Sequence, residues 1–137
     1  MNYSFNKSEH LCSDISIAKL FENGESFISY PLRVIWKAED TPGQSSVKVM
    51  VSVSKKKLKH AVDRNLAKRL VRESYRLNKL HLKNIVAANQ KSVSICFIWI
   101  PDKTLTFKKT ENRVKLALAK IAATINSFDN SNEGKQE

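Results

Sequence analysis

Lysine and arginine side chains gather in one part of this chain of 137 residues. Between Lys48 and Lys91 there are 13 basic residues and two acidic ones, a net charge of +11 that equals the net charge of the whole chain. Concentrating like charge costs self-repulsion unless a polyanion relieves it, so the segment is typical of a nucleic-acid-binding protein. A well-solvated basic face is the alternative interpretation.

The basic segment divides into a loop and a helix. Residues 55–60 read Lys-Lys-Lys-Leu-Lys-His, and the pattern over 61–83 is helical. At 100° per residue one arc of this helix is cationic, Lys79 included. The opposite arc, with Val62, Leu66, Leu70 and Leu77 and continued by Ala67 and Val71, is predicted to cover a sheet. Lysine can neutralise a phosphate as a mobile charge, and arginine can engage two phosphate oxygens. The basic residues predicted to contact RNA phosphates are Lys55, Lys56, Lys57, Lys59, Arg64, Lys68, Arg69, Arg72 and Arg76.

Asn65 is the uncharged polar residue within the cationic arc. Its amide could bond a base edge, a ribose hydroxyl or a metal-bound water, or could simply be solvated. A basic amphipathic helix can also lie on a membrane or bind a calmodulin-type partner. The apolar arc is needed for the core of the domain, which disfavours both of these alternatives.

A search for catalytic or metal-binding residues finds no suitable pattern. His10, His60 and His81 are scattered, and paired carboxylates, a glycine-rich phosphate loop and Ser/Cys–His spacings are missing. Asp63 and Glu73 in the basic helix are better explained by local ion pairs or capping. We therefore expect no catalytic residue, no metal ligand and no small-molecule substrate on this chain.

Cysteines and hydropathy indicate the compartment. Cys12 and Cys96 stand 84 positions apart, which fits neither a disulfide framework nor a metal site. The longest apolar stretch, around 93–100, is far shorter than the roughly 20 residues of a membrane span. No secretory signal is recognised at the N-terminus. The expectation is a reduced, cytoplasmic protein without a membrane partner.

The remaining pattern predicts an α+β fold. The order is α-β-β-α-β-α, and Pro31 can split the first strand region into two strands. Glycine at position 24 is expected to form a left-handed cap of the first helix. The expected elements are a helix over 13–23, strands over 27–37, 47–54 and 93–99, and helices over 61–83 and 110–125. Residues 1–125 are predicted to form one RNA-binding domain, followed by a disordered tail over 126–137.

The stretch SVSKKKLKHAVDRNLAKRLVRES, residues 52–74, closely resembles the protein subunit of bacterial ribonuclease P. That family has a strand ending in S-V-S/A-K-K and then A-V-x-R-N-R-x-K-R-x-x-R-E at the start of its basic helix. A looser resemblance extends to Phe5–Gly24, to the strand over 93–99 and to the C-terminal helix. Leu66 stands where the family has a second arginine, and Ile17 where an aromatic residue is frequent. Leu66 is expected on the apolar side of the helix, where the loss matters little for phosphate contact.

The resemblance implies a fold and a function. The fold is a four-stranded mixed sheet covered by helices, in the order α-β-β-β-α-β-α, with a left-handed β-α-β crossover where general rules favour a right-handed one. The function is that of a protein partner of a catalytic RNA, in a complex that hydrolyses precursor tRNA and releases the 5′ leader. Mg²⁺ ions held mainly by the RNA perform the chemistry, and no organic cofactor is implied.

A cleft for the single-stranded leader is also expected from the resemblance. It would be formed by Lys48, Met50 and Ser52 on one sheet face, with Phe21 and Trp36. Stacking on an aromatic ring tolerates any base, which suits leaders of varied sequence. Phe21 fits a core position equally well, and Trp36 fits one better. The competing class of function is a structural RNA-binding protein of the ribosomal type.

Overall fold

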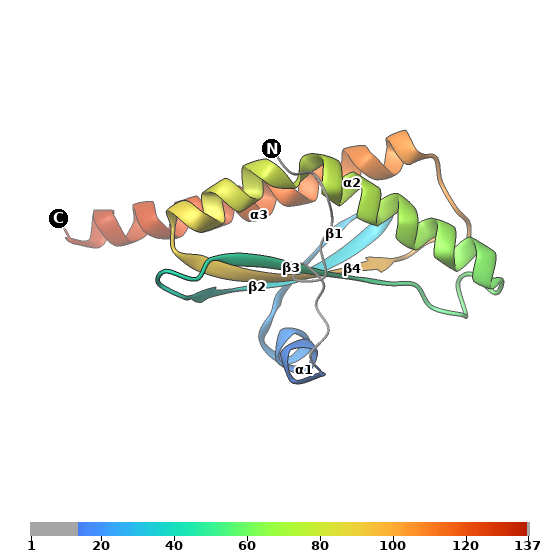
Figure 1. Ribbon diagram of the computed structural model, residues 1–137, viewed down its shortest axis with the longest axis horizontal. Helices are drawn as coiled ribbons and strands as arrows, with labels where there is room; N and C mark the ends of the chain where they lie inside the picture. The colour runs from blue at the N-terminus through green and yellow to red at the C-terminus, as the bar shows by residue number, and fades with distance from the viewer. Residues whose placement is uncertain (1–13, 137) are drawn as a thin grey trace.

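A computed structural model of the protein describes the backbone of residues 14–136 and the side chains of residue 18 and of 20–127. Helices α2 and α3 cover one face of a sheet, and α1 lies on the other face (Figure 1). The order α-β-β-β-α-β-α is as predicted, with Pro31 between the first two strands. The elements are α1 (Asp14–Asn23), β1 (Glu25–Ser29), β2 (Leu32–Asp40), β3 (Ser46–Ser52), α2 (Ala61–Ala88), β4 (Lys91–Trp99) and α3 (Phe107–Gln136).

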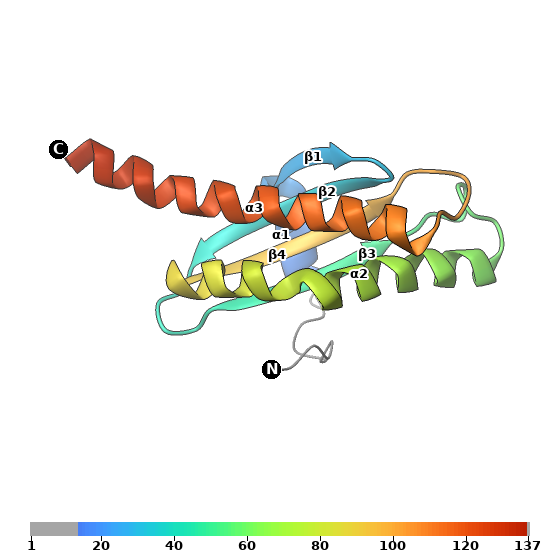
Figure 2. The ribbon, with the colours of Figure 1, turned by 90° about the horizontal axis from the view of Figure 1, so that it is seen from above.

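The four strands form one mixed sheet in the order β1-β2-β4-β3. The β1–β2 and β2–β4 pairs are antiparallel, whereas β3 and β4 are parallel neighbours joined through α2. In Figure 2 helices α2 and α3 lie in front of the sheet, β3 and β4 run to the right, and β4 lies above β3. The connection through α2 is therefore left-handed, in agreement with the expectation from the resemblance and against the general rule.

Three connections lie at the same end of the sheet because of this strand arrangement. Since β3 and β4 run in the same direction, the loops that follow them, residues 53–60 and 100–106, leave the sheet at one end. The turn at residues 30–31 is there too, because Leu32 at the start of β2 pairs with Trp99 at the end of β4. We call this the loop end. Figures 1 and 2 both place the starts of α2 and α3 beside it.

The main core lies between the sheet and helices α2 and α3. Val47, Val49 and Val51 of β3 point into it, while Lys48 on the same strand is exposed. This alternation was predicted from the sequence. Trp99 at the end of β4 is 1% exposed and is among the largest fully buried side chains.

A smaller core lies under α1 on the other face of the sheet. It is formed by Leu20, Ile35 and Cys96, with Met50 partly buried against it. Burial raises the pKa of the Cys96 thiol to about 11, so this side chain packs as a small neutral group. Among the described side chains of α1, Leu20 is thus the one that packs into this core.

Gly24 has a different role from the predicted left-handed cap. It is not among the residues with positive φ, where the described glycine is Gly43 at 79°. A Cβ at position 24 would clash with the carbonyl oxygen of Leu20 and lie 2.9 Å from Cγ2 of Ile35. Glycine is therefore required by the close approach of α1 to β2, and the prediction of a left-handed cap is wrong.

The last two helices are longer than predicted. α2 ends at Ala88 rather than near Lys83, and α3 starts at Phe107 and continues to Gln136. Helix α3 therefore runs through residues for which the sequence predicts a disordered tail. The division into a domain over 1–125 and a tail over 126–137 stays a prediction.

Candidate RNA interface

The loop before α2 displays its lysine side chains because its own backbone and one buried leucine hold it in place. The hydroxyl of Ser54 accepts hydrogen bonds from the backbone N–H groups of Lys56 and Lys57, at 3.1 and 3.2 Å. Leu58 is 4% exposed and belongs to the main core. The four lysines, Lys55, Lys56, Lys57 and Lys59, are exposed. The loop is thus a fixed turn with four cations directed to solvent.

Arg64 connects this loop to the first turn of α2. One guanidinium nitrogen donates to the carbonyl oxygens of Leu58 and Lys59, both at 2.9 Å. The side chain is half-buried, so part of the cation is still accessible. Arg64 therefore positions the lysines in addition to contributing its own charge.

The orientation of α2 differs from the predicted one. Val62, Leu66 and Leu77, predicted to cover the sheet, are 77%, 40% and 41% exposed. Ala67 and Val71, which continue the predicted apolar arc, are buried as expected, and the buried strip extends from them to the side of the helix that carries Lys79. Its members are Ala67, Val71, Ser74, Tyr75, Lys79, Leu82 and Val86. The physical reason is that α2 packs against β3, β4 and α3 at once, and this fixes which strip is buried.

This orientation divides the predicted basic residues of α2 into two groups. Arg69 and Arg72 are exposed and make no ion pair or hydrogen bond with any residue that the structure describes. Lys68 and Arg76 are half-buried. Lys79, placed on the cationic arc by its angle, is 2% exposed and is part of the interior. Asn65 is exposed beside the cations, as predicted from its angle.

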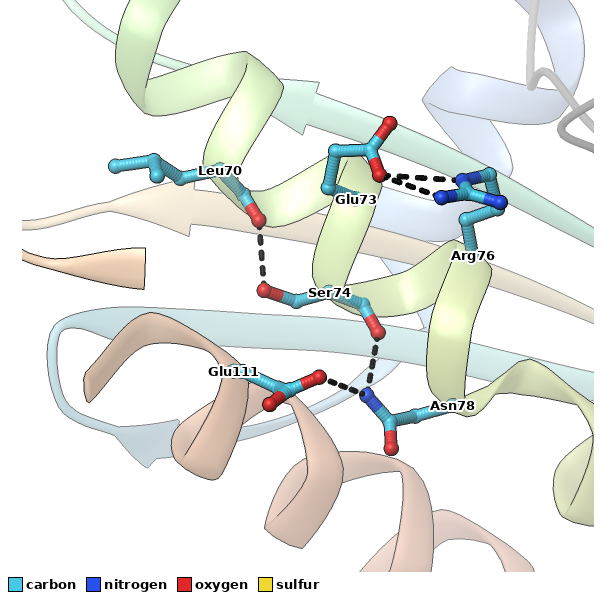
Figure 3. A network of polar contacts seen from close by, with 6 residues as sticks. All are labelled: Leu70, Glu73, Ser74, Arg76, Asn78 and Glu111. Atoms are coloured by element: carbon cyan, nitrogen blue, oxygen red, sulfur yellow. Dashed lines mark hydrogen bonds and ion pairs between the residues drawn. The ribbon is translucent and has the colours of Figure 1, made fainter. Parts of the chain in front are cut away.

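Arg76 already has an anionic partner. Its guanidinium donates to one carboxylate oxygen of Glu73, at 2.8 and 3.2 Å (Figure 3). The prediction that Glu73 serves a local ion pair is therefore confirmed. One turn further on, Asn78 donates to the carbonyl oxygen of Ser74 and to Glu111 of α3, at 2.8 and 3.2 Å. The Asn78–Glu111 hydrogen bond connects α2 to α3, and the other contacts lie within α2.

A second surface is the face of the sheet on the α1 side. Lys48, Met50 and Ser52 lie together on this face of β3, with Lys48 exposed and the other two half-buried. Phe21 of α1 is 49% exposed, so it is not a core side chain. The side chain of Ile17 lies outside the described residues. An aromatic ring, a cation and a thioether are thus available on the α1 side.

Trp36 does not belong to this surface. It is 4% exposed and is part of the main core beneath α2 and α3, on the opposite face from Met50. Residues that alternate along β2 point to opposite faces, and Ile35 is the one directed toward α1. The core position that the sequence favours for Trp36 is therefore confirmed, and its grouping with Phe21 is wrong.

The described residues contain no group of three His, Cys, Asp or Glu side chains that could hold a metal ion. The amide of Asn65 has the cations Arg64, Lys68 and Arg69 as helix neighbours, which disfavours a divalent ion held by this chain alone. None of the described helices is long and apolar enough to cross a membrane.

Comparisons with known proteins identify the family. Residues 5–122 match the sequence profile of the family described as Ribonuclease P. The chain belongs to the ribonuclease P protein family. The Ribonuclease P protein component of Porphyromonas gingivalis is 35% identical over 131 residues, which cover 96% of each chain. The component from Clostridioides difficile is 32% identical over 112 residues, 81% of this chain and 90% of that one.

Solved structures of the family have the same fold. The RNase P protein of Staphylococcus aureus superimposes with a TM-score of 0.62 at 25% identity, covering 85% of this chain and 96% of that chain. The RNase P protein of Thermotoga maritima superimposes with a TM-score of 0.60 at 22% identity, over 80% and 94% of the two chains. As a ribonuclease P protein component, the chain is part of an endoribonuclease of tRNA processing.

Proposed function

We propose that this chain binds the catalytic RNA of ribonuclease P through the loop before α2 and the exposed side of that helix. The observation that carries the proposal is the set of exposed cations, Lys55, Lys56, Lys57, Lys59, Arg69 and Arg72, for which no anionic partner is found among the described residues. Such cations release counterions when they neutralise phosphates, which is the main source of affinity for RNA. Lys68, Asn65 and the accessible part of Arg64 extend the same surface.

The sheet face beside α1 is the proposed contact for the 5′ leader of precursor tRNA. Phe21 would stack on a base, and Lys48 would neutralise a phosphate, next to Met50 and Ser52. Stacking on an aromatic face accepts any base and suits substrates of different sequence. Because the described residues hold no metal-ligand cluster, the Mg²⁺ ions of the reaction would be held by RNA.

Reconstitution tests the proposal directly. The whole chain, mixed with the catalytic RNA and precursor tRNA at low Mg²⁺, is expected to restore cleavage at the 5′ end of the mature tRNA. The physical reason is that protein cations reduce the phosphate repulsion that Mg²⁺ otherwise has to offset. Gel analysis of the cleavage products measures the effect. RNA binding without stimulated cleavage would favour a structural RNA-binding protein and reject the proposal.

Two arginines of the interface are expected to respond differently to substitution. Arg72→Ala removes one exposed charge and should reduce the slope of log K against log salt by up to about one unit. Arg64→Ala should reduce the slope further, because the carbonyls of Leu58 and Lys59 lose their donor. The loop over residues 53–60, here called the lysine loop, would then be held less firmly. Filter binding of the catalytic RNA over a range of salt concentrations measures both slopes.

Arg64→Lys is the control for the positioning role of Arg64. Lysine keeps the charge but lacks the planar group that reaches two carbonyl oxygens. We expect this variant to bind RNA more weakly than the unsubstituted chain. Binding equal to that of the unsubstituted chain would mean that Arg64 acts as a charge alone, and an unchanged slope for Arg72→Ala would exclude Arg72 from the phosphate contacts.

A further inference from the structure

A cavity of about 790 Å³ opens at the loop end, and none of its lining residues belongs to the surfaces proposed above. Its wall comes from three segments: the turn at 30–31, the loop over 100–106 and the first turns of α3. The volume lies within the range of roughly 300–1,000 Å³ that is usual for ligand sites. The cavity is therefore large enough for a ligand, and its lining indicates which kind.

Four cations line the cavity. They are Lys103 of the loop and Lys109, Arg113 and Lys115 of α3. Among the described residues no acidic side chain lines the cavity, and none of the four cations has an ion-pair partner. Lys109 and Arg113 are also four positions apart on one helix face, where like charges repel. Since no described acidic side chain forms an ion pair with either of them, the lining suits an anion.

The cavity also has an apolar wall. Tyr30 is 54% exposed and Leu116 is 56% exposed, and Leu105 is half-buried beside them. A free phosphate would use the cations and leave this wall in water. A nucleotide would use both, because its base can stack on the tyrosine ring while its phosphate meets a cation.

The walls of the cavity are held in place by hydrogen bonds. The carbonyl oxygen of Pro31 accepts from the N–H of Ile100 at 2.9 Å, and the indole N–H of Trp99 donates to the carbonyl oxygen of Lys103 at 3.0 Å. The hydroxyl of Ser29 donates to the carbonyl oxygen of Arg113 at 3.1 Å, which connects β1 to α3. Little ordering of the backbone would thus be needed when a ligand binds.

We propose that this cavity binds a nucleotide of single-stranded RNA, with its base on Tyr30 and its phosphate on Lys109 and Arg113. The inference goes beyond the proposed function, which uses α2 and the sheet face beside α1. The lysine loop over 53–60 lies at the same end of the molecule (Figures 1 and 2). An RNA bound to those lysines therefore has a second contact site at that end.

The test uses the whole chain and a fluorescently labelled hexauridylate, with binding measured by anisotropy. Tyr30→Ala should weaken binding by about fivefold or more, because stacking on one base contributes about 1–3 kcal/mol. Tyr30→Phe keeps the ring and should bind like the unsubstituted chain. Arg113→Ala should weaken binding more than Lys108→Ala, an equal charge change at an exposed position of α3 outside the cavity. Equal binding by the Ala and Phe variants at position 30 would overturn the proposal.

Amide chemical shifts locate the bound oligonucleotide. Changes in the amide chemical shifts at Tyr30, Leu105 and Arg113 when the oligonucleotide is added, which are lost at the same positions in the Tyr30→Ala variant, would support binding in the cavity. Shifts confined to the lysine loop or to β3, or equally strong binding of hexaglutamate, would overturn the assignment to RNA. Cleavage is measured in a separate experiment. The proposal for the cavity can therefore be overturned while reconstitution supports the proposed function, and the proposed function can be overturned while the cavity still binds the oligonucleotide.

Two precursor tRNAs distinguish the sources of the nucleotide. In the reconstituted enzyme, a defect of Tyr30→Ala limited to precursors with long leaders assigns the nucleotide to the leader. A defect with long and short leaders alike assigns it to the catalytic RNA. A variant without a defect on either substrate, and without the loss of hexauridylate binding, contradicts the proposal.

Discussion

Replacing Lys55, Lys56, Lys57 and Lys59 together by glutamine should weaken binding of the catalytic RNA by roughly a hundredfold or more at about 0.15 M salt. The four side chains are exposed on a loop whose path is fixed by Ser54 and Leu58, neither of which changes in this variant. The loss should therefore come from phosphate contacts and not from unfolding. The slope of log K against log salt should fall by about three units, measured by filter binding.

The matched control removes the same number of charges elsewhere. The lysines to be replaced by glutamine are Lys37, Lys91, Lys108 and Lys120, none of which belongs to the lysine loop or lines the cavity. This variant should keep most of its affinity, because none of the four lysines is among the proposed phosphate contacts. Equal losses in the two variants would mean that net charge, and not the loop, determines binding.

The sequence predicted the sheet well because its signals are local. The alternation of Val47, Val49 and Val51 with Lys48 fixes the face of β3, and Pro31 separates β1 from β2. The handedness of the connection from β3 through α2 to β4 could not be predicted from such local signals. General rules favour the right-handed form, and only the resemblance to the family pointed to the left-handed one.

The side of α2 that is buried could not be predicted from the sequence pattern over residues 61–83 alone. Tyr75, Leu82 and Val86 are buried on the side of the helix that also carries Arg64 and Lys68. The sequence pattern places the apolar residues Val62 and Leu66 against the sheet, whereas both side chains are exposed. Helix α2 packs against both the sheet and α3. The pattern of apolar residues in one helix does not show which strip of its surface these two partners bury.

The candidate site shows the same division between local and distant information. The lysine loop and Asn65 were found from residue type and spacing, and they are exposed as expected. The hydrogen bonds of Arg64 to two loop carbonyls and the burial of Trp36 depend on the folded backbone. The cavity at the loop end could not be predicted at all, because its wall combines three segments that are distant in sequence.

Replacing Trp99 by alanine should lower the free energy of unfolding by about 3–5 kcal/mol, the second large effect that we expect. Trp99 is 1% exposed in the main core, so its removal leaves a cavity that neighbouring side chains fill only in part. Urea unfolding followed by circular dichroism measures the change. A loss below about 1 kcal/mol would show that the core closes around the missing ring.

Trp99→Phe separates the two roles of this side chain. Phenylalanine keeps most of the packing but cannot donate to the carbonyl oxygen of Lys103, so the loop over 100–106 loses one fixed point. We expect a much smaller loss of stability than in Trp99→Ala, together with weaker binding of hexauridylate. If Trp99→Phe instead binds hexauridylate like the unsubstituted chain, the indole hydrogen bond does not help to position the wall of the cavity, and Trp99 acts through the core alone.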